Sequence, residues 1–267
     1  MSVLWRFSLP AFLSGTMVSP VRWIANAMLV AQAGGYAELG IFMAATQFRN
    51  ILELIGSRIG IALLPILASQ EASRSDKLAR ANMLLSWSIG VAAAVPLVAL
   101  PEVIGLFGEQ FAGVSAQRTL LLVLCFTSVI MYKHGLARVI TAEGMMWWAF
   151  LSNAVWATLL LSSFWFLRPF GAIGLAGAYL VAYVVNTICF VPLYSRIRLI
   201  PPGTLMSRET LGIWLILASQ TALAWWRVSI YIRLLALFAA IVLLTWAFHR
   251  LLRGRGTLRI SSTVEHG

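Results

Sequence analysis

Three charged side chains interrupt the apolar segment ATQFRNILELIGSRIGIALLPILAS, residues 44–68. Arg49, Glu53 and Arg58 lie in a stretch that is long enough to cross a bilayer as a helix. A charge at the bilayer centre costs about 3 kcal/mol on insertion scales, so these side chains are expected to pair with one another or to face water. Guanidinium groups present a planar fork of donors, and such arginines could therefore bind phosphate.

Helical periodicity gathers most of the polar residues of this segment on one face. With 3.6 residues per turn, Glu53 falls about 40° and Asn50 about 100° from Arg49 around the helix axis. Thr46 and Ser57 fall between Glu53 and Asn50 around the axis, whereas Arg58 falls on the opposite side of the helix. Arg58 is therefore expected to contact a neighbouring helix or to extend toward the headgroups.

The preceding segment repeats this arrangement. Arg22 and Asn26 share one face with Gly15 and Ser19, and Arg22 lies roughly 18 Å along its helix, near the middle of the membrane. We expect the two polar faces to meet at a common interior surface, with Glu53 pairing with Arg22 or Arg49.

A third group of basic residues, Lys133, His134 and Arg138, lies in a later apolar segment. Together with the earlier arginines they face a single intramembrane carboxylate, and an excess of positive charge favours an anion-binding site. Two alternatives remain open. The charges could form only an ion-pair clasp between helices, and the third group could extend toward the cytoplasmic headgroups instead of lining a site.

The composition requires membrane-spanning helices to position these groups. The chain has 267 residues, of which 60% are hydrophobic and only 11% are charged, too few to cover a soluble domain. The sequence predicts an all-α, polytopic transmembrane bundle of about eight spans. They are expected at residues 10–33, 40–69, 81–100, 119–141, 147–167, 174–194, 211–226 and 230–248. The short seventh span could instead be re-entrant or interfacial.

The basic residues between the spans predict how the chain is oriented, because cytoplasmic loops are enriched in Lys and Arg. Placing the N-terminus in the cytoplasm puts only three arginines between spans on the outside, Arg118, Arg168 and Arg227. The cytoplasmic side then holds Arg6, Arg74, Lys77, Arg80, Arg138, Arg196, Arg198, Arg208, Arg250, Arg253, Arg255 and Arg259. Both termini are therefore expected in the cytoplasm of a bacterial inner-membrane protein.

Several chemistries are disfavoured by what the sequence contains. Asp76 is its only aspartate, and we find no acidic pair, HExxH motif or nucleophile elbow. Cys125 and Cys189 lie in apolar blocks and are expected to be packed thiols. We therefore expect no catalytic residue, metal or cofactor, and no nucleic-acid partner, because the net charge of +11 is explained by membrane orientation. A metal-independent ligase or transferase acting on lipid-linked saccharides remains an alternative.

An ordered series of short motifs resembles the second half of polysaccharide and O-antigen flippases of the multidrug/oligosaccharidyl-lipid/polysaccharide exporter superfamily. The motifs are FSLPAFLSG (7–15), AELGIFMAATQFRNILELIGSRIGIALLPILAS (37–69), LFGEQF (106–111), VITAEG (139–144) and GAIGLAGAYLVAY (171–183). This resemblance covers roughly residues 5–195. It implies a six-helix lobe at residues 1–200, two additional helices at 201–249 and a basic cytoplasmic tail at 250–267.

The resemblance further implies a substrate and a missing partner. Such flippases carry a polyprenyl-diphosphate-linked oligosaccharide across the inner membrane in a cationic cavity between two lobes. By analogy, Arg22, Arg49 and Arg58, with Asn26 and Asn50, occupy cavity positions. Since only one lobe is present, we expect the other lobe to come from a longer gene product, a separate chain or a second copy. A non-transporting remnant is the remaining alternative.

Overall fold

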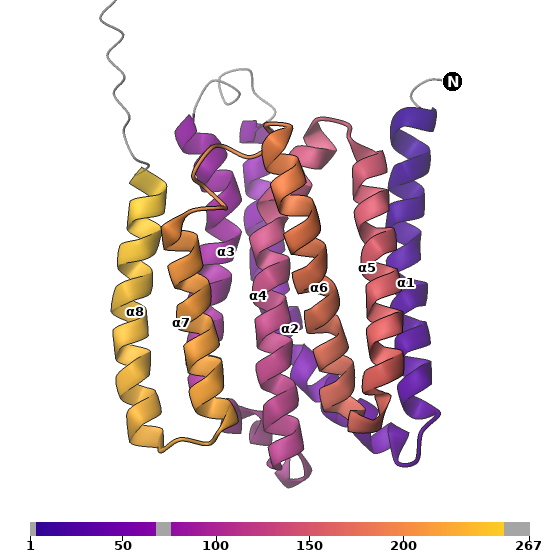
Figure 1. Ribbon diagram of the computed structural model, residues 1–267, viewed down its shortest axis with the longest axis vertical. Helices are drawn as coiled ribbons and strands as arrows, with labels where there is room; N and C mark the ends of the chain where they lie inside the picture. Colours follow the sequence, from indigo (N-terminus) through magenta and orange to yellow (C-terminus); the bar gives the residue numbers. More distant parts are fainter. Residues whose placement is uncertain (1–3, 68–75, 254–267) are drawn as a thin grey trace, which may run out of the picture.

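The computed structural model describes residues 4–67 and 76–253, and within these ranges it is built from helices packed side by side (Figure 1). The long helices of this part are α1 (Leu9–Val30), α2 (Gly35–Leu67), α3 (Asp76–Ala99), α4 (Val114–Ala142), α5 (Met146–Leu167), α6 (Gly171–Arg196), α7 (Arg208–Trp225) and α8 (Ile230–Arg253). Short helical segments η1 (Leu4–Ser8), η3 (Pro101–Phe107), η4 (Glu109–Phe111) and η5 (Arg168–Phe170) join or extend them.

Each of the eight predicted spans corresponds to one of these helices, so the all-α prediction is confirmed. In the described part of the chain, four helical segments are long and apolar enough to cross a membrane: Leu78–Ala99, Val114–Ala142, Met146–Arg196 and Ile230–Arg253. The third of these includes both α5 and α6. The short seventh span forms one uninterrupted helix of 18 residues, α7, and Ser207 caps its first turn through a bond from Thr210 N.

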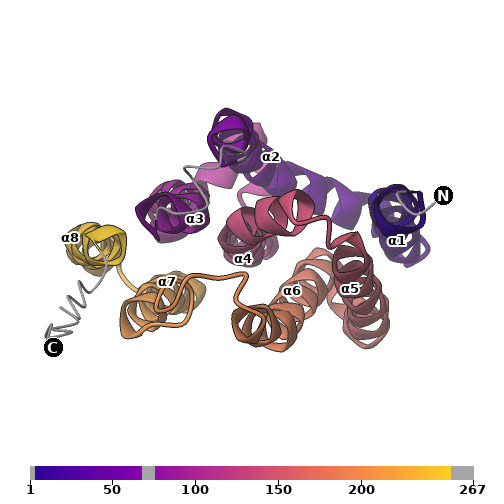
Figure 2. The same cartoon turned by 90° about the horizontal axis from the view of Figure 1, so that it is seen from above.

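The helices run alternately up and down, so the N-terminal end of α1 and the C-terminal end of α8 lie at the same end of the bundle (Figure 1). Viewed from above, α4 occupies the middle, α1 lies at one edge and α8 at the other (Figure 2). α4 packs against α2, α3 and α6. This central position explains why its side chains, among them Leu120, Leu124 and Phe126, are fully buried.

A glycine allows α3 and α4 to approach closely. A Cβ atom added at Gly135 on α4 would lie 2.5 Å from the Asn82 backbone oxygen and from the Met83 Cα atom on α3. Asn82 uses this proximity, because its Nδ2 donates to the Gly135 carbonyl at 3.1 Å. Small residues at such crossings are typical of membrane helix pairs.

A carboxylate at the lower end of the bundle fixes α2 to α6. Oε2 of Glu38, in the first turn of α2, accepts a hydrogen bond of 2.7 Å from the backbone N–H of Ala172, in the first turn of α6. An acidic group at a helix N-terminus is stabilised by the helix dipole. Gly171, the residue before Ala172, has a φ of +57°, and a Cβ atom there would collide with the Glu38 side chain.

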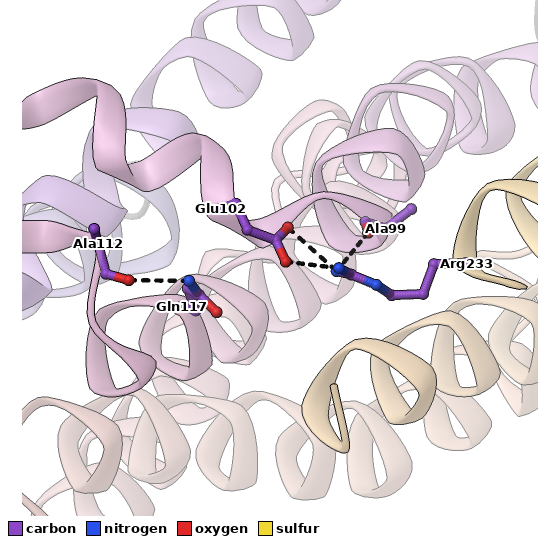
Figure 3. Close-up of polar contacts among 5 residues, drawn as sticks. All are labelled: Ala99, Glu102, Ala112, Gln117 and Arg233. Atoms are coloured by element: carbon purple, nitrogen blue, oxygen red, sulfur yellow. Dashed lines mark hydrogen bonds and ion pairs between the residues drawn. The ribbon is translucent and has the colours of Figure 1, made fainter. Parts of the chain in front are cut away.

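The helices α7 and α8 lie beside α3 at the edge of the bundle (Figure 2). Only 22% of the apolar stretch of α8 is buried, compared with 67% for α4. Arg233 anchors the first turn of α8 through bonds to the Ala99 carbonyl at 3.0 Å and to Glu102 Oε1 at 2.6 Å (Figure 3). At the other end, Phe248 packs edge-on against the buried Trp87 of α3.

Candidate binding site

Arg49 and Glu53 form an intrahelical ion pair on α2. The Arg49 Nε atom donates to Glu53 Oε1 at 2.8 Å, and one terminal nitrogen donates to Oε2 at 3.1 Å. Arg49 is only 6% exposed and its guanidinium lies 5.8 Å from the centre of the Phe126 ring on α4. The i, i+4 spacing places the two side chains on one face, so their charges balance within a single helix.

Arg22 faces the same region from α1, and Asn26 follows it by one helical turn on the same helix. Arg22 and Arg49 both lie close enough to Tyr179 and Tyr183 of α6 for their charges to act on the two phenols. Within the described residues, Arg22 Nε and Asn26 Oδ1 are buried and have no hydrogen-bond partner. Buried polar atoms are nearly always paired, so this pair of atoms is available to a ligand or to water.

Aromatic rings form the wall behind these cations. Tyr179 stacks on Phe42 and Phe126 with ring centres 5.6 Å and 5.3 Å apart, and Trp156 of α5 lies 5.5 Å from Tyr183. The Trp156 indole N–H is also buried without a partner in the described part of the structure. These residues escape sequence-based detection because aromatic side chains are common throughout the apolar segments.

Lys133 enters a polar network that joins three helices. Its Nζ donates to Asn186 Oδ1 on α6, which also accepts from Ser152 Oγ on α5 at 3.1 Å. Asn186 Nδ2 donates in turn to the Ser152 carbonyl at 2.8 Å. The network pairs the ammonium with a neutral amide, so it holds the charge in place without neutralising it.

The other two members of the predicted third group have different surroundings. His134 packs against Gly56 of α2, where an added Cβ would lie 3.2 Å from its Nδ1, and it is near enough to Glu53 to interact electrostatically. Arg138 points to α3 instead, because its Nε donates to Asn82 Oδ1 at 2.6 Å and a terminal nitrogen to the Asn82 carbonyl at 2.7 Å. Arg138 therefore joins two helices in this structure.

Arg58 and Asn50 lie away from this cluster, on the exposed surface of α2. Arg58 follows Arg49 by nine residues, two and a half turns, and the two side chains consequently point in opposite directions. The structure thus brings together Arg22, Asn26, Arg49 and Glu53, places His134 beside Glu53, and does not bring Arg58 to them. Asn50 and Ser57 continue the polar face of α2 onto the outer surface of the bundle.

The net charge of the assembled cluster remains positive. Arg22 and Arg49 supply two cations, and Glu53 is the carboxylate that lies in the same region of the described residues. We refer to Arg22, Asn26, Arg49, Glu53 and Tyr183 as the cationic cluster. One positive charge in excess, with unpaired donors and flat aromatic rings, suits an anion attached to a larger polar group.

Two curated proteins are similar to this chain. One is the EPS I polysaccharide export inner membrane protein EpsE of Ralstonia solanacearum, 28% identical over 188 residues that cover 67% of this chain and 42% of the relative. The protein with the same description from Ralstonia nicotianae is 26% identical over 202 residues, covering 69% and 44%. The chain thus spans about two fifths of the length of the curated relatives it matches. No family model and no solved structure matches the chain.

Proposed function

We propose that this chain is part of an inner-membrane transporter that moves a diphosphate-linked saccharide lipid across the membrane during polysaccharide or lipopolysaccharide biosynthesis. The observation that carries this proposal is the uncompensated positive charge of the cationic cluster. Arg22 contributes most, because within the described residues no carboxylate forms an ion pair with it and its Nε is unpaired. A planar guanidinium matches the oxygens of a diphosphate.

The two relatives support the biological setting. Both are named for polysaccharide export at the inner membrane, and a polytopic helical chain fits that location. The proposed role is therefore in the synthesis or export of a polysaccharide at this membrane, with transport of its lipid-linked unit as the finer proposal. In keeping with the excess of basic residues between spans, both termini are proposed to lie in the cytoplasm.

The remaining helices of the transporter come, in this proposal, from a second lobe. Asn50, Ser57 and Arg58 are exposed on α2, and Ser19 is exposed on α1. A second six-helix lobe placed against these helices would enclose the polar face and turn it into the wall of a cavity. The lobe would be another segment of a longer protein, a separate chain or a second copy of this one, since parallel repeats in such transporters are related by an axis along the membrane normal.

The test is complementation of a bacterial strain whose own polysaccharide flippase gene is deleted. The chain, alone and fused to the first half of its curated relative, is compared with Arg22→Gln, Arg49→Gln and the double variant. Loss of a charged hydrogen bond, about 1.5–3 kcal/mol, should lower surface polysaccharide by about tenfold or more in Arg22→Gln, with less effect in Arg22→Lys.

Arg118→Gln is the matched control, because Arg118 stacks on Trp225 at the lower end of the bundle, away from the cationic cluster. Membrane levels of each variant are measured by immunoblot, so that misfolding is distinguished from loss of transport. Normal polysaccharide from the Arg22→Gln, Arg49→Gln double variant would remove the assigned site. Accumulation of lipid-linked saccharide in the inner leaflet would support it.

A further inference from the structure

A groove is lined by residues of the first half of α7 and the last half of α8. These two helices lie at the edge of the bundle opposite α1 (Figure 2). The volume of the groove is about 430 Å³, within the range of small-molecule sites. The residues that line it include Arg208, Gly212 and Ile216 of α7, and Leu243, Trp246 and Arg250 of α8. Basic residues therefore lie at its mouth, and apolar residues lie along its length.

The mouth of the groove is electropositive. Arg208 begins α7, where the helix dipole adds positive potential, and Arg250 lies in the last turn of α8. Both arginines are exposed, and the Arg250 guanidinium lies 4.3 Å from the centre of the Trp246 ring. Glu209 also lines the groove and partly offsets this charge, while Arg253 follows Arg250 by one turn on the same helix.

The body of the groove lies within the part of α8 that is apolar enough to span a membrane. Leu243 and Trp246 are each about half exposed, and Gly212 has no atom within 4 Å of an ideal Cβ position. The low burial of α8 shows that protein side chains leave much of this helix uncovered. A hydrocarbon chain is the occupant whose chemistry matches an apolar groove in this position.

We propose that this groove binds one anionic glycerophospholipid, with its phosphodiester between Arg208 and Arg250 and an acyl chain along Gly212, Ile216 and Leu243. Basic pockets between membrane helices bind anionic headgroups in this way. Charge complementarity selects an anionic lipid over a zwitterionic one, because the amine of phosphatidylethanolamine would face two arginines. The site is separate from the cationic cluster and does not depend on the proposed transport.

Native mass spectrometry of the purified chain tests the proposal, with phosphatidylglycerol and phosphatidylethanolamine supplied in equal amounts. The wild type should retain one phosphatidylglycerol preferentially. Each arginine near a membrane surface contributes about 1 kcal/mol to binding an anionic lipid, so Arg208→Gln and Arg250→Gln should each weaken retention by about fivefold. Arg168→Gln is the matched control, because Arg168 also stacks on a tryptophan, Trp165, but at the opposite end of the bundle.

A second pair of variants tests the groove while leaving its charges intact. Gly212→Leu places a side chain in the open space of the groove and should abolish selective retention, whereas Gly212→Ala should keep most of it. Circular dichroism confirms that each variant keeps its helix content. Equal retention of the two lipids by the wild type, or unchanged phosphatidylglycerol retention in Gly212→Leu and in the Arg208→Gln, Arg250→Gln double variant, would overturn the proposal.

Discussion

At the scale of single residues, the structure separates cations that are balanced from cations that are not. Arg49 is held by Glu53, and Arg233 is held by Glu102 and the Ala99 carbonyl. Within the described residues, Arg22 and Lys133 form no ion pair with a carboxylate. The ion pairs therefore explain why Arg49 and Arg233 are tolerated in the bundle, whereas no ion pair explains Arg22 and Lys133. For this reason we consider Arg22 a ligand-binding group.

The Arg49–Glu53 pair provides a prediction at this scale. Glu53→Gln removes the charge that balances a buried guanidinium, and breaking a buried pair in this way costs about 3–5 kcal/mol when both partners are buried. Because Glu53 is 26% exposed, we expect a smaller loss, about 1–3 kcal/mol, in thermal unfolding of the detergent-solubilised protein. The Arg49→Met, Glu53→Met double variant should recover part of this loss, since it removes both charges.

A double-mutant cycle supplies the control for this prediction. Arg49→Met alone leaves only the partly exposed carboxylate and should be milder than Glu53→Gln. Glu53→Met alone completes the cycle: if the effects of Arg49→Met and Glu53→Met measured singly added up to that of the double variant, the two side chains would not be energetically coupled, and the ion pair would have no role in stability.

The Glu102–Arg233 contact predicts a dependence on pH. Partial burial acts to raise the pKa of the Glu102 carboxyl, but the hydrogen bonds from Arg233 outweigh it, and the pKa lies below the ordinary value of 4.5. A depressed folded-state pKa means that the contact stabilises the fold above the unfolded-state value. This stabilisation is lost as the pH falls from about 4.5 through the folded-state pKa.

Hydrogen exchange at the start of α8 measures this effect. Amides of residues 230–236 should exchange faster at pH 3.5 than at pH 5.5, after correction for intrinsic rates. Glu102→Gln should exchange fast at both values, because its amide has no charge to lose. Equal protection of the wild type at both pH values would show that α8 does not depend on the ionised carboxylate.

At the scale of elements, close packing of α3 on α4 holds the centre of the bundle. Gly135 permits the approach, and Arg138 reinforces it through its bonds to Asn82 and to Ser86 Oγ at 3.3 Å. A guanidinium that donates to a helix carbonyl and to two side chains fixes both the distance and the rotation of the pair. These contacts make α3 and α4 a rigid support for the helices that carry the cationic cluster.

Substitution of Gly135 tests this packing. Gly135→Ala forces a methyl group against the α3 backbone, and overpacking of this kind costs about 1–3 kcal/mol. Gly40→Ala, on α2, is the matched control, because an added Cβ there has no neighbour within 4 Å. The melting temperature should fall for Gly135→Ala and stay level or rise for Gly40→Ala, whereas equal melting temperatures would contradict the close approach.

The sequence predicted the helices better than it predicted the contacts between them. Apolar length alone located all eight helices of the described chain, because a helix that crosses hydrocarbon must be long and uninterrupted. Helical spacing also placed Glu53 within reach of Arg49. It did not predict that Arg138 would bind Asn82, or that Lys133 would bind Asn186, because those pairs depend on how each helix is rotated against its neighbours.

At the scale of the whole molecule, the charges of the described chain differ between the two ends of the bundle. The lower end carries Arg118, Arg168, Arg227 and Arg233 together with Glu38, Glu102 and Glu109, so these formal charges sum to only +1. The upper end carries an excess of arginines, including Arg80, Arg196, Arg198, Arg208, Arg250 and Arg253. The upper end is thus the one expected to face the cytoplasm.

Cysteine labelling in intact cells tests this orientation. In a background with Cys125→Ser and Cys189→Ser, Leu106→Cys at the lower end should react with a membrane-impermeant maleimide added outside. Met206→Cys, at the upper end, should react only after permeabilisation. Leu106 is 83% and Met206 is 60% exposed, so both positions are accessible to the reagent, and the reverse labelling pattern would invert the assigned topology.

The first helix is fastened to the helices that follow it. Trp147 Nε1 donates to the Trp5 carbonyl at 3.0 Å, Asn153 Nδ2 donates to Ser14 Oγ at 2.8 Å, and Glu38 fixes the hairpin of α1 and α2 to α6. Two of these bonds hold η1 and the upper end of α1 to α5, and the third holds α2, which continues the hairpin from the lower end of α1, to α6. The first helix therefore cannot swing independently of its neighbours. If these helices take part in transport, they must rotate together as one rigid body. The hinge then lies outside this group of helices, at the interface with whatever faces α1 and α2.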